Sequence, residues 1–157
     1  MNLIEAIEKK ALLLDCTAAD KAELLEVMIK KLCKSSRVKG CDAVHEAIIE
    51  REELSSTGMG RGVAMPHARL SGVSFPTLGF ARLPDGVDFD SVDGQPVKLV
   101  FMLLTPSSNP ELNVQLLGKL SRICMKEENR EKLLAVEKTT DLLTLVREWD
   151  AENGFGA

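Results

Sequence analysis

The sequence predicts an α/β fold in which helices cover a mixed β-sheet. The segment L-V-F-M-L-L at 99–104 is continuously apolar, which is typical of a central strand covered on both faces. Segments with apolar residues at helical spacing occur before, between and after the expected strands. With 157 residues and no internal repeat or long linker, the chain is expected to form a single domain over residues 1–150.

The first third of the chain carries clear helix signals. Thr17 and Asp20 form a T-x-x-D helix start, and the apolar residues after it recur at helical spacing. The polar segment S-S-R-V-K-G at 35–40 ends this helix. We therefore expect a helix over 2–9, a strand over 11–15, and helices over about 18–34 and 41–53.

The second half is expected to supply two long strands and then helices. The strands are expected at 77–82 and 97–104, around a turn-rich segment with a short strand near Val87. A helix after Pro110 buries one stripe of residues: Asn113, Leu116, Leu117, Leu120 and Cys124. Further helices are expected over about 128–136 and 140–149, followed by a frayed tail at 151–157.

A glycine-rich segment with one histidine is the most informative part of the chain. It covers residues 51–69 and reads R-E-E-L-S-S-T-G-M-G-R-G-V-A-M-P-H-A-R. Its glycines can adopt positive φ or admit the close approach of another group. The residues at 63–65 are expected to form a short strand, which Pro66 ends because its ring restricts the backbone. His67 is therefore expected on a loop just past a strand end, where functional side chains are commonly presented.

Composition and charge argue against several classes of function. A net charge of −4 and an aromatic content of 4% do not suit a nucleic-acid-binding protein, which needs a basic patch or a stacking platform. No apolar run approaches the ~18 residues of a membrane span, and the N-terminus is not a signal peptide, so a cytoplasmic location without membrane insertion is expected. The four cysteines form no C-x-x-C pair and are expected to be reduced thiols rather than disulfides or zinc ligands.

Side chains that can bind phosphate accompany the histidine. They are Arg51, Ser55, Ser56 and Thr57, all upstream of His67. A neutral imidazole, with a pKa near about 6.5, offers a nitrogen nucleophile at neutral pH. A guanidinium fork with hydroxyl and backbone N–H donors can hold the negative charge of a phosphorylated ring. The glycine pattern is neither a P-loop nor G-x-G-x-x-G, and it precedes a strand, so a nucleotide site is not expected.

Other interpretations of these residues are open at this point. His67 alone is commonly an incidental surface residue, and Arg51 a solvated charge near a helix C-terminus. A hydrolase triad lacks the G-x-S-x-G elbow, and no cysteine has a context that suggests cysteine–histidine catalysis. His45 lies in the middle of an expected helix without an evident acidic partner, so it is expected to be a partly exposed helix residue. Metal binding has weak support, because the chain has only two histidines and their positions are unrelated.

The chain resembles a known family over nearly its whole length. The motifs that carry the resemblance are E-R-E-E-L-S-S-T-G at 50–58, G-V-A-M-P-H-A at 62–68, K-A-E-L-L at 21–25 and N-V-Q-L-L-G-K-L at 113–120. Together they resemble the fructose/mannitol-type enzyme IIA family of the bacterial phosphoenolpyruvate-dependent phosphotransferase system. The resemblance implies a three-layer α/β/α sandwich around a mixed sheet, and it argues against an incidental histidine.

The resemblance also implies roles for particular residues. His67 would be the phosphoryl acceptor, forming a tele-phosphohistidine intermediate, and Arg51 would help to hold the phosphoryl group. Ser56, Thr57, Gly58 and Asn113 would support the bound group. The donor would be the phosphohistidine carrier HPr or its nitrogen-branch version, and no metal or diffusible cofactor would be needed.

One position departs from the family pattern and leaves three roles to compare. Family members often carry a second histidine near the acceptor, where this chain has Asn113, an amide that neither titrates near neutrality nor carries phosphate. The absence of an attached IIB-type or membrane part favours a nitrogen-regulatory IIA protein. The alternatives are a sugar-specific IIA component that passes phosphate to a IIB domain, and a regulatory binding module that is not phosphorylated.

Overall fold

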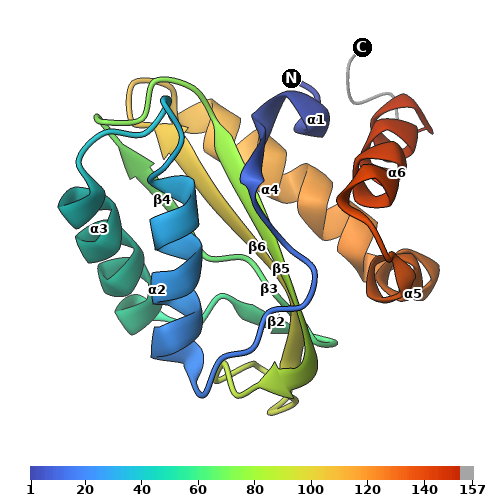
Figure 1. Cartoon of the computed structure of the whole chain (residues 1–157). Coiled ribbons are helices and arrows are strands. Elements are labelled where there is room, and N and C mark those ends of the chain that lie inside the picture. The colour runs from blue at the N-terminus through green and yellow to red at the C-terminus, as the bar shows by residue number, and fades with distance from the viewer. Residues whose placement is uncertain (153–157) are drawn as a thin grey trace.

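Two layers of helices enclose a mixed β-sheet in the computed structural model, which describes residues 1–152 (Figure 1). Within these residues the helices are α1 (Leu3–Ala6), α2 (Lys21–Leu32), α3 (Cys41–Leu54), α4 (Pro110–Met125), α5 (Glu127–Ala135) and α6 (Thr139–Glu152). The strands are β1 (Ile7–Leu13), β2 (Gly58–Gly60), β3 (Val63–Ala64), β4 (His67–Leu70), β5 (Thr77–Val87) and β6 (Val97–Pro106).

The strands follow the order β1-β5-β6-β3-β2, and β4 also pairs with β6. β5 and β6 are antiparallel, whereas β1 runs parallel to β5, and β3 and β4 both run parallel to β6. The sheet is therefore mixed, as the sequence predicts. Since β5 occupies one edge of β6, β3 and β4 lie one after the other along its opposite edge, with Met65 and Pro66 between them.

Successive residues of β6 alternate between two apolar cores, as the pleat of a strand requires. On one face lie Val100, Met102 and Leu104, and on the other lie Leu99, Phe101 and Leu103. All six are almost completely buried. The continuous apolar run at 99–104 is thus a central strand covered on both faces, which confirms the prediction.

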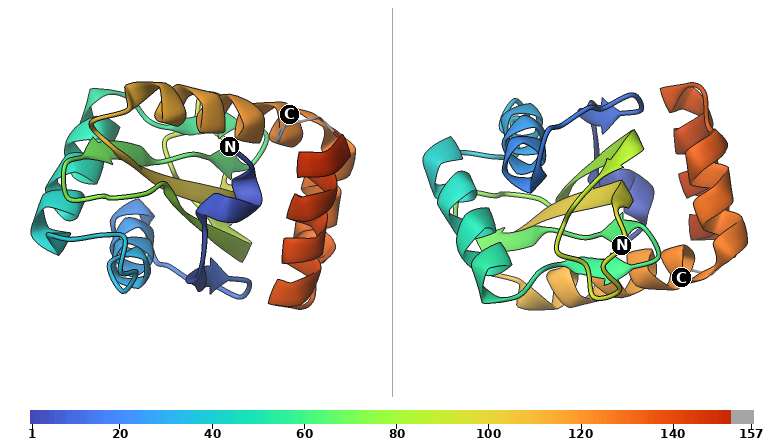
Figure 2. Two further views of the ribbon diagram at one scale, coloured as in Figure 1. Left: turned by 90° about the horizontal axis from the view of Figure 1, so that it is seen from above. Right: turned by 90° about the horizontal axis from the view of Figure 1, so that it is seen from below.

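The helices divide between the two faces of the sheet. α2 packs on β1 and β5, and α3 packs on β4, on one face. α4 and α5 contact β6 on the other face, and α6 packs against α1 there. The views of Figure 2, turned by 90° from Figure 1, show the sheet between these two layers. The expected three-layer α/β/α sandwich is confirmed.

Several element boundaries differ from those expected. The N-terminal helix is only four residues long, and β1 already begins at Ile7 rather than at residue 11. Asp20, rather than Thr17, caps α2, because its carboxylate accepts the backbone N–H of Glu23 at 2.9 Å. β5 continues to Val87 and includes the short strand expected there. α6 continues to Glu152, so residues 151 and 152 of the expected tail are helical, and residues 153–157 lie outside the described part.

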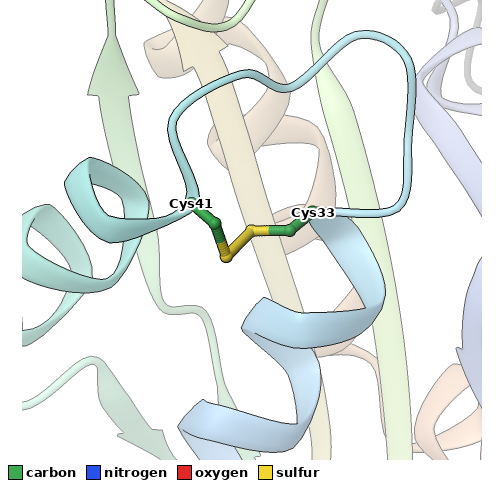
Figure 3. The surroundings of a disulfide bond; sticks show 2 residues. All are labelled: Cys33 and Cys41. Carbon is green, nitrogen blue, oxygen red and sulfur yellow. A yellow bond between two sulfur atoms is a disulfide. The ribbon is translucent and has the colours of Figure 1, made fainter.

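Cys33 and Cys41 form a disulfide between the end of α2 and the start of α3 (Figure 3). The expectation of four reduced thiols is therefore wrong for this pair. The connection turns back at Gly40, whose φ of 77° is a conformation that glycine adopts readily. This brings the two Cα atoms to 5.7 Å, a separation that a disulfide spans. Cys16 and Cys124 remain thiols, and both are buried.

Candidate functional site

A pocket of about 360 Å³ contains the histidine of the glycine-rich segment. The end of α3, the loop after it, the β3–β4 connection and one face of α4 all contribute to its wall. The lining residues are Arg51, Ser56, Thr57, Gly58, Met59, Met65, His67, Val92, Leu117 and Ser121. Five predicted site residues therefore meet in one place, and Asn113 is not among the lining residues.

His67 is the first residue of β4, so the expectation that it would lie on a loop is wrong. β3 ends at Ala64, two residues before Pro66, but the chain resumes pairing with β6 immediately after this proline. His67 lies in register with Leu103, whose backbone N–H donates to the carbonyl of Pro66 at 3.0 Å. The imidazole is consequently presented from a paired strand, which fixes its backbone more firmly than a loop would.

The hydrogen bonding of the His67 ring defines its tautomer. Nδ1 lies 2.9 Å from the backbone carbonyl oxygen of Met65. A carbonyl oxygen can only accept a hydrogen bond, so Nδ1 carries the proton of the neutral ring. The lone pair of the neutral imidazole is then on Nε2. This nitrogen is the one that can act as a nucleophile.

Burial and neighbouring charges keep the imidazole neutral. Burial lowers the pKa of His67 below its ordinary value, and the positive charges of Arg51 and Arg69 lower it as well. The hydrogen bond to Met65 and the charge of Glu52 act in the opposite direction and only partly offset this decrease. Because the resulting pKa lies below 6.5, the neutral form predominates at pH 7.

Arg51 comes from the last turn of α3 and lines the same pocket as His67. One guanidinium nitrogen, Nη1, donates to the backbone carbonyl of Ser55 at 2.9 Å. This bond folds the side chain back over the helix C-terminus and satisfies a carbonyl that the helix leaves unpaired. A guanidinium has five N–H donors in all, so others can serve an anion in the pocket.

The hydroxyl groups of Ser56 and Thr57 already have acceptors. Ser56 Oγ donates to the carbonyl of Phe89 at 2.6 Å, and Thr57 Oγ1 donates to the carboxylate of Glu52. Since each hydroxyl has a single proton, neither can donate to a phosphoryl group without breaking an existing bond. These two residues therefore form and fix the pocket wall.

Gly58 occupies a crowded position in this wall. A β-carbon at Gly58 would lie 2.5 Å from Oγ of Ser91 and 3.0 Å from its Cα. Its backbone N–H donates to Ser56 Oγ at 3.0 Å, and its carbonyl accepts the N–H of Val92 at 3.2 Å. The close approach of the 91–92 backbone thus explains why only glycine fits here.

Asn113 is buried on the first turns of α4, with 7% of its surface exposed. Its Oδ1 accepts a hydrogen bond from Thr105 Oγ1 at 3.3 Å. The side chain thus ties α4 to the end of β6, whereas Leu117 and Ser121 form the α4 wall of the pocket. Sequence reasoning placed Asn113 beside the expected acceptor, assigned Leu117 only to the buried stripe of this helix, and did not single out Ser121.

Glu52 is a buried residue whose role sequence reasoning missed. It stands in the E-R-E-E run next to Arg51, where an unbroken series of charges gives no sign that one carboxylate points inward. Its carboxylate pairs with Lys21 and accepts two hydrogen bonds from Thr57. His45 also differs from expectation, because its Nε2 lies 3.3 Å from the carboxylate of Glu26 on the molecular surface.

The part of the chain that the structure describes offers no cluster of three or more His, Cys, Asp or Glu residues able to hold a metal ion. Across residues 1–152, no helix is long and apolar enough to cross a membrane. The chemistry of the pocket is instead that of a neutral imidazole beside a guanidinium. Such a pair suits a protein that carries a compact anionic group.

The fold and the pocket are those of a phosphotransfer protein, and sequence comparison identifies the family. Residues 5–149 match the family described as "Phosphoenolpyruvate-dependent sugar phosphotransferase system, EIIA 2". The chain belongs to this family of IIA-type phosphotransfer proteins. The resemblance inferred from the motifs at 50–58 and 62–68 is confirmed.

The relatives similar to this chain include fructose-specific EIIA proteins and nitrogen regulatory proteins. The fructose-specific EIIA component of Haloferax volcanii is 43% identical over 119 residues, which cover 76% of this chain and 77% of that protein. A nitrogen regulatory protein of Pseudomonas aeruginosa is 32% identical over 142 residues, covering 90% of this chain and 91% of the relative. The fructose-specific EIIABC component of Bacillus subtilis is 35% identical over 150 residues, but the chain spans only 24% of its length.

Solved structures share the whole fold. The nitrogen regulatory protein IIA-Ntr of Neisseria meningitidis superposes with a TM-score of 0.85 at 33% identity, covering 92% of this chain and 98% of that one. The mannitol IIA of Escherichia coli, solved in complex with phosphorylated IIB, has a TM-score of 0.76 at 21% identity, covering 90% of this chain and 98% of that one. The second likeness supports the fold alone.

Proposed function

We propose that the protein accepts a phosphoryl group on Nε2 of His67 from the phosphohistidine of an HPr-type carrier. The observation that carries this proposal is the hydrogen bond from Nδ1 to the Met65 carbonyl, at 2.9 Å. It leaves the lone pair of the neutral ring on Nε2, so the product would be a tele-phosphohistidine.

The transfer is an in-line displacement between two nitrogen atoms. The Nε2 lone pair of His67 attacks phosphorus, the N–P bond of the donor breaks, and the donor imidazole recovers its electron pair. Nδ1 keeps its proton, and the Met65 carbonyl stabilises the positive charge that the phosphorylated ring acquires. Arg51 offsets the negative charge of the phosphoryl oxygens. The chain thereby acts as a phosphotransferase-system component that is itself modified.

The rim of the pocket suits a protein donor. Val92 and Met59, which line the pocket, are 87% and 42% exposed, and Leu54, at the end of α3, is 83% exposed. Apolar side chains exposed beside a polar centre are typical of a surface that a protein partner covers. A donor and acceptor of this kind meet in the cytoplasm, where we place the protein.

Intact-mass measurement tests the carrier chemistry. The protein is incubated with phosphoenolpyruvate, enzyme I and an HPr-type carrier. We expect a single acid-labile phosphate adduct, lost in His67→Ala and retained in the matched control His45→Ala. An adduct on the His67→Ala protein would contradict the assignment of the acceptor.

Asn113 does not favour the alternative of a binding module that is never phosphorylated. Its Oδ1 accepts from Thr105, and Leu117 and Ser121, not Asn113, form the α4 wall of the pocket. An amide at position 113 therefore leaves the surroundings of the acceptor nitrogen intact. Labelling of the wild-type protein on His67 would exclude the binding module, and failure with every carrier would support it.

Downstream of the acceptor we favour a nitrogen-regulatory role. Similarity to the Neisseria IIA-Ntr structure, at a TM-score of 0.85 and 33% identity, supports it. The second candidate is a sugar-specific IIA component, supported by 43% identity to the fructose-specific EIIA of Haloferax. Mixing the phosphorylated protein with candidate IIB domains separates the two roles. Phosphate transfer to a IIB cysteine would establish the sugar-specific role, and retention on His67 with every IIB domain would support the regulatory one.

A further inference from the structure

Glu52 is a buried carboxylate at the end of α3, with 8% of its surface exposed. Its Oε2 lies 2.8 Å from Nζ of Lys21 and accepts the backbone N–H of Thr57 at 3.1 Å. Its Oε1 accepts the hydroxyl of Thr57. A carboxylate so placed remains buried because a cation and two further donors compensate for its lost hydration.

Hydrogen bonds continue from Thr57 to the imidazole. The carbonyl of Thr57 accepts the backbone N–H of Met65 at 3.2 Å. The carbonyl of the same Met65 accepts Nδ1–H of His67 at 2.9 Å. The backbones of two residues, Thr57 and Met65, therefore connect the Glu52 carboxylate to Nδ1 of His67, the ring atom that fixes the tautomer.

The cation that holds Glu52 is anchored independently. Nζ of Lys21 lies 4.4 Å above the ring of Phe89 and 3.5 Å from its carbonyl oxygen. That carbonyl also accepts the hydroxyl of Ser56. The loop at 55–58 is consequently held at two successive residues, Ser56 and Thr57, by one network that includes Glu52.

We propose that Glu52 is a positioning residue for phosphoryl transfer, which holds Thr57 and Met65 so that the ring of His67 keeps its proton on Nδ1 and presents Nε2 to the pocket. This inference rests on the proposed function of His67. Glu52 is not among the residues that line the pocket, and the polar partners of its carboxylate are Lys21 and Thr57. Its effect on the imidazole passes through the backbone of Thr57 and then through the backbone of Met65.

The pKa of His67 distinguishes the effect of Glu52 from that of Arg51. Arg51 from α3 and Arg69 from β4 lower the pKa of His67, and Glu52 raises it. The α4 wall contributes Leu117 and Ser121, which carry no charge. Loss of the Glu52 charge should therefore lower the pKa of His67 further, opposite to the effect of losing Arg51.

The experiment compares Glu52→Ala, Glu52→Gln and a matched control, Glu53→Gln, in which the neighbouring exposed carboxylate is neutralised. Nitrogen-15 NMR of the His67 ring reports the tautomer and the pKa, and His45 serves as the internal reference. Stopped-flow labelling by the phosphorylated HPr-type carrier reports the rate. Both are measured on folded protein, as judged by amide spectra.

In Glu52→Ala we expect a mixture of tautomers and labelling slowed about 10- to 100-fold, because a misplacement on the order of 1 Å costs that much in positioning. Glu52→Gln keeps an acceptor for the Thr57 N–H, so it should restore most of the Nδ1–H tautomer while lowering the pKa of His67. Glu53→Gln should behave as wild type.

The proposal is overturned if Glu52→Ala lowers stability but leaves the tautomer and the labelling rate of folded protein unchanged, since Glu52 would then be only structural. If Glu52→Ala does not fold, the test rests on Glu52→Gln. Wild-type values for both the pKa of His67 and the labelling rate in this variant would reject the proposal. If wild-type protein is never labelled, the function proposed for His67 fails, and the tautomer still tests the link from Glu52 to the ring.

Discussion

At the scale of single residues, the pocket depends on a neutral His67 beside the guanidinium of Arg51. We expect Arg51→Ala to slow labelling about 10- to 100-fold, because a hydrogen bond to a charged group contributes roughly 1.5–3 kcal/mol. Arg51→Lys is the matched control, since it keeps the charge but loses the fork that binds two oxygens at once. Stopped-flow labelling of both variants checks this. Wild-type rates in Arg51→Ala would make Arg51 a surface charge.

The lowered pKa of His67 predicts how the labelling rate depends on pH at the acidic end. Because only the neutral ring is a nucleophile, the labelling rate should fall with pH through a midpoint below 6.5. Arg51→Ala should move this midpoint upward, because Arg51 lowers the pKa. The unfolded chain binds the proton at a higher pH than the folded protein, so the free energy of unfolding should decrease as the pH falls below about 6.5. A midpoint above 6.5 in the wild type would contradict the burial argument.

At the scale of elements, the Cys33–Cys41 disulfide joins one end of α2 to α3, while the Lys21–Glu52 ion pair joins the other ends. Closing so short a loop should stabilise the oxidised protein by about 2–3 kcal/mol through the lost entropy of the unfolded chain. Urea unfolding with and without a reductant measures this difference.

Two variants control the disulfide prediction. Paired Cys33→Ser and Cys41→Ser substitutions should remove the effect of the reductant, and Cys16→Ala should leave it intact. Burial raises the pKa of Cys124 to about 12, so this thiol should not react in the native protein. Rapid alkylation of the native oxidised protein at Cys33 or Cys41 would show that the bond had not formed.

At the scale of the whole molecule, the apolar rim of the pocket is expected to be the surface where the donor protein docks. Val92→Asp, at a residue 87% exposed, should leave stability within about 0.5 kcal/mol and slow labelling by the carrier about 5- to 10-fold. Leu134→Asp, a similar change at an exposed residue of α5 outside the pocket lining, should have no effect.

A small phosphoryl donor distinguishes docking from chemistry at this surface. Phosphoramidate needs no protein interface, so it should label Val92→Asp and wild type at equal rates. Equal slowing with phosphoramidate and with the carrier would mean that the substitution damages the acceptor itself.

The sequence by itself determined the layers of the fold and predicted the segment that carries the proposed acceptor. The apolar run at 99–104 required a strand with both faces covered, and the helical stripes around it required two layers of helices. The family resemblance, carried by the motifs at 50–58 and 62–68 together with those in two helices, singled out His67 as the expected acceptor. The layers follow from local patterns, because burial periodicity and backbone restrictions act between near neighbours in the chain, whereas the role of His67 is what the resemblance implies.

Only the tertiary structure decided which neighbours surround that histidine. His67 lies in a strand because it pairs with β6 beyond Pro66, and Asn113 accepts a hydrogen bond from Thr105 and does not line the pocket of His67. The inward carboxylate of Glu52 and the Cys33–Cys41 pair were equally hidden. Glu52 pairs with Lys21, which is distant in the sequence, and Cys33 and Cys41 meet only because of the turn at Gly40. Sequence spacing alone does not encode the geometry that brings such residues together.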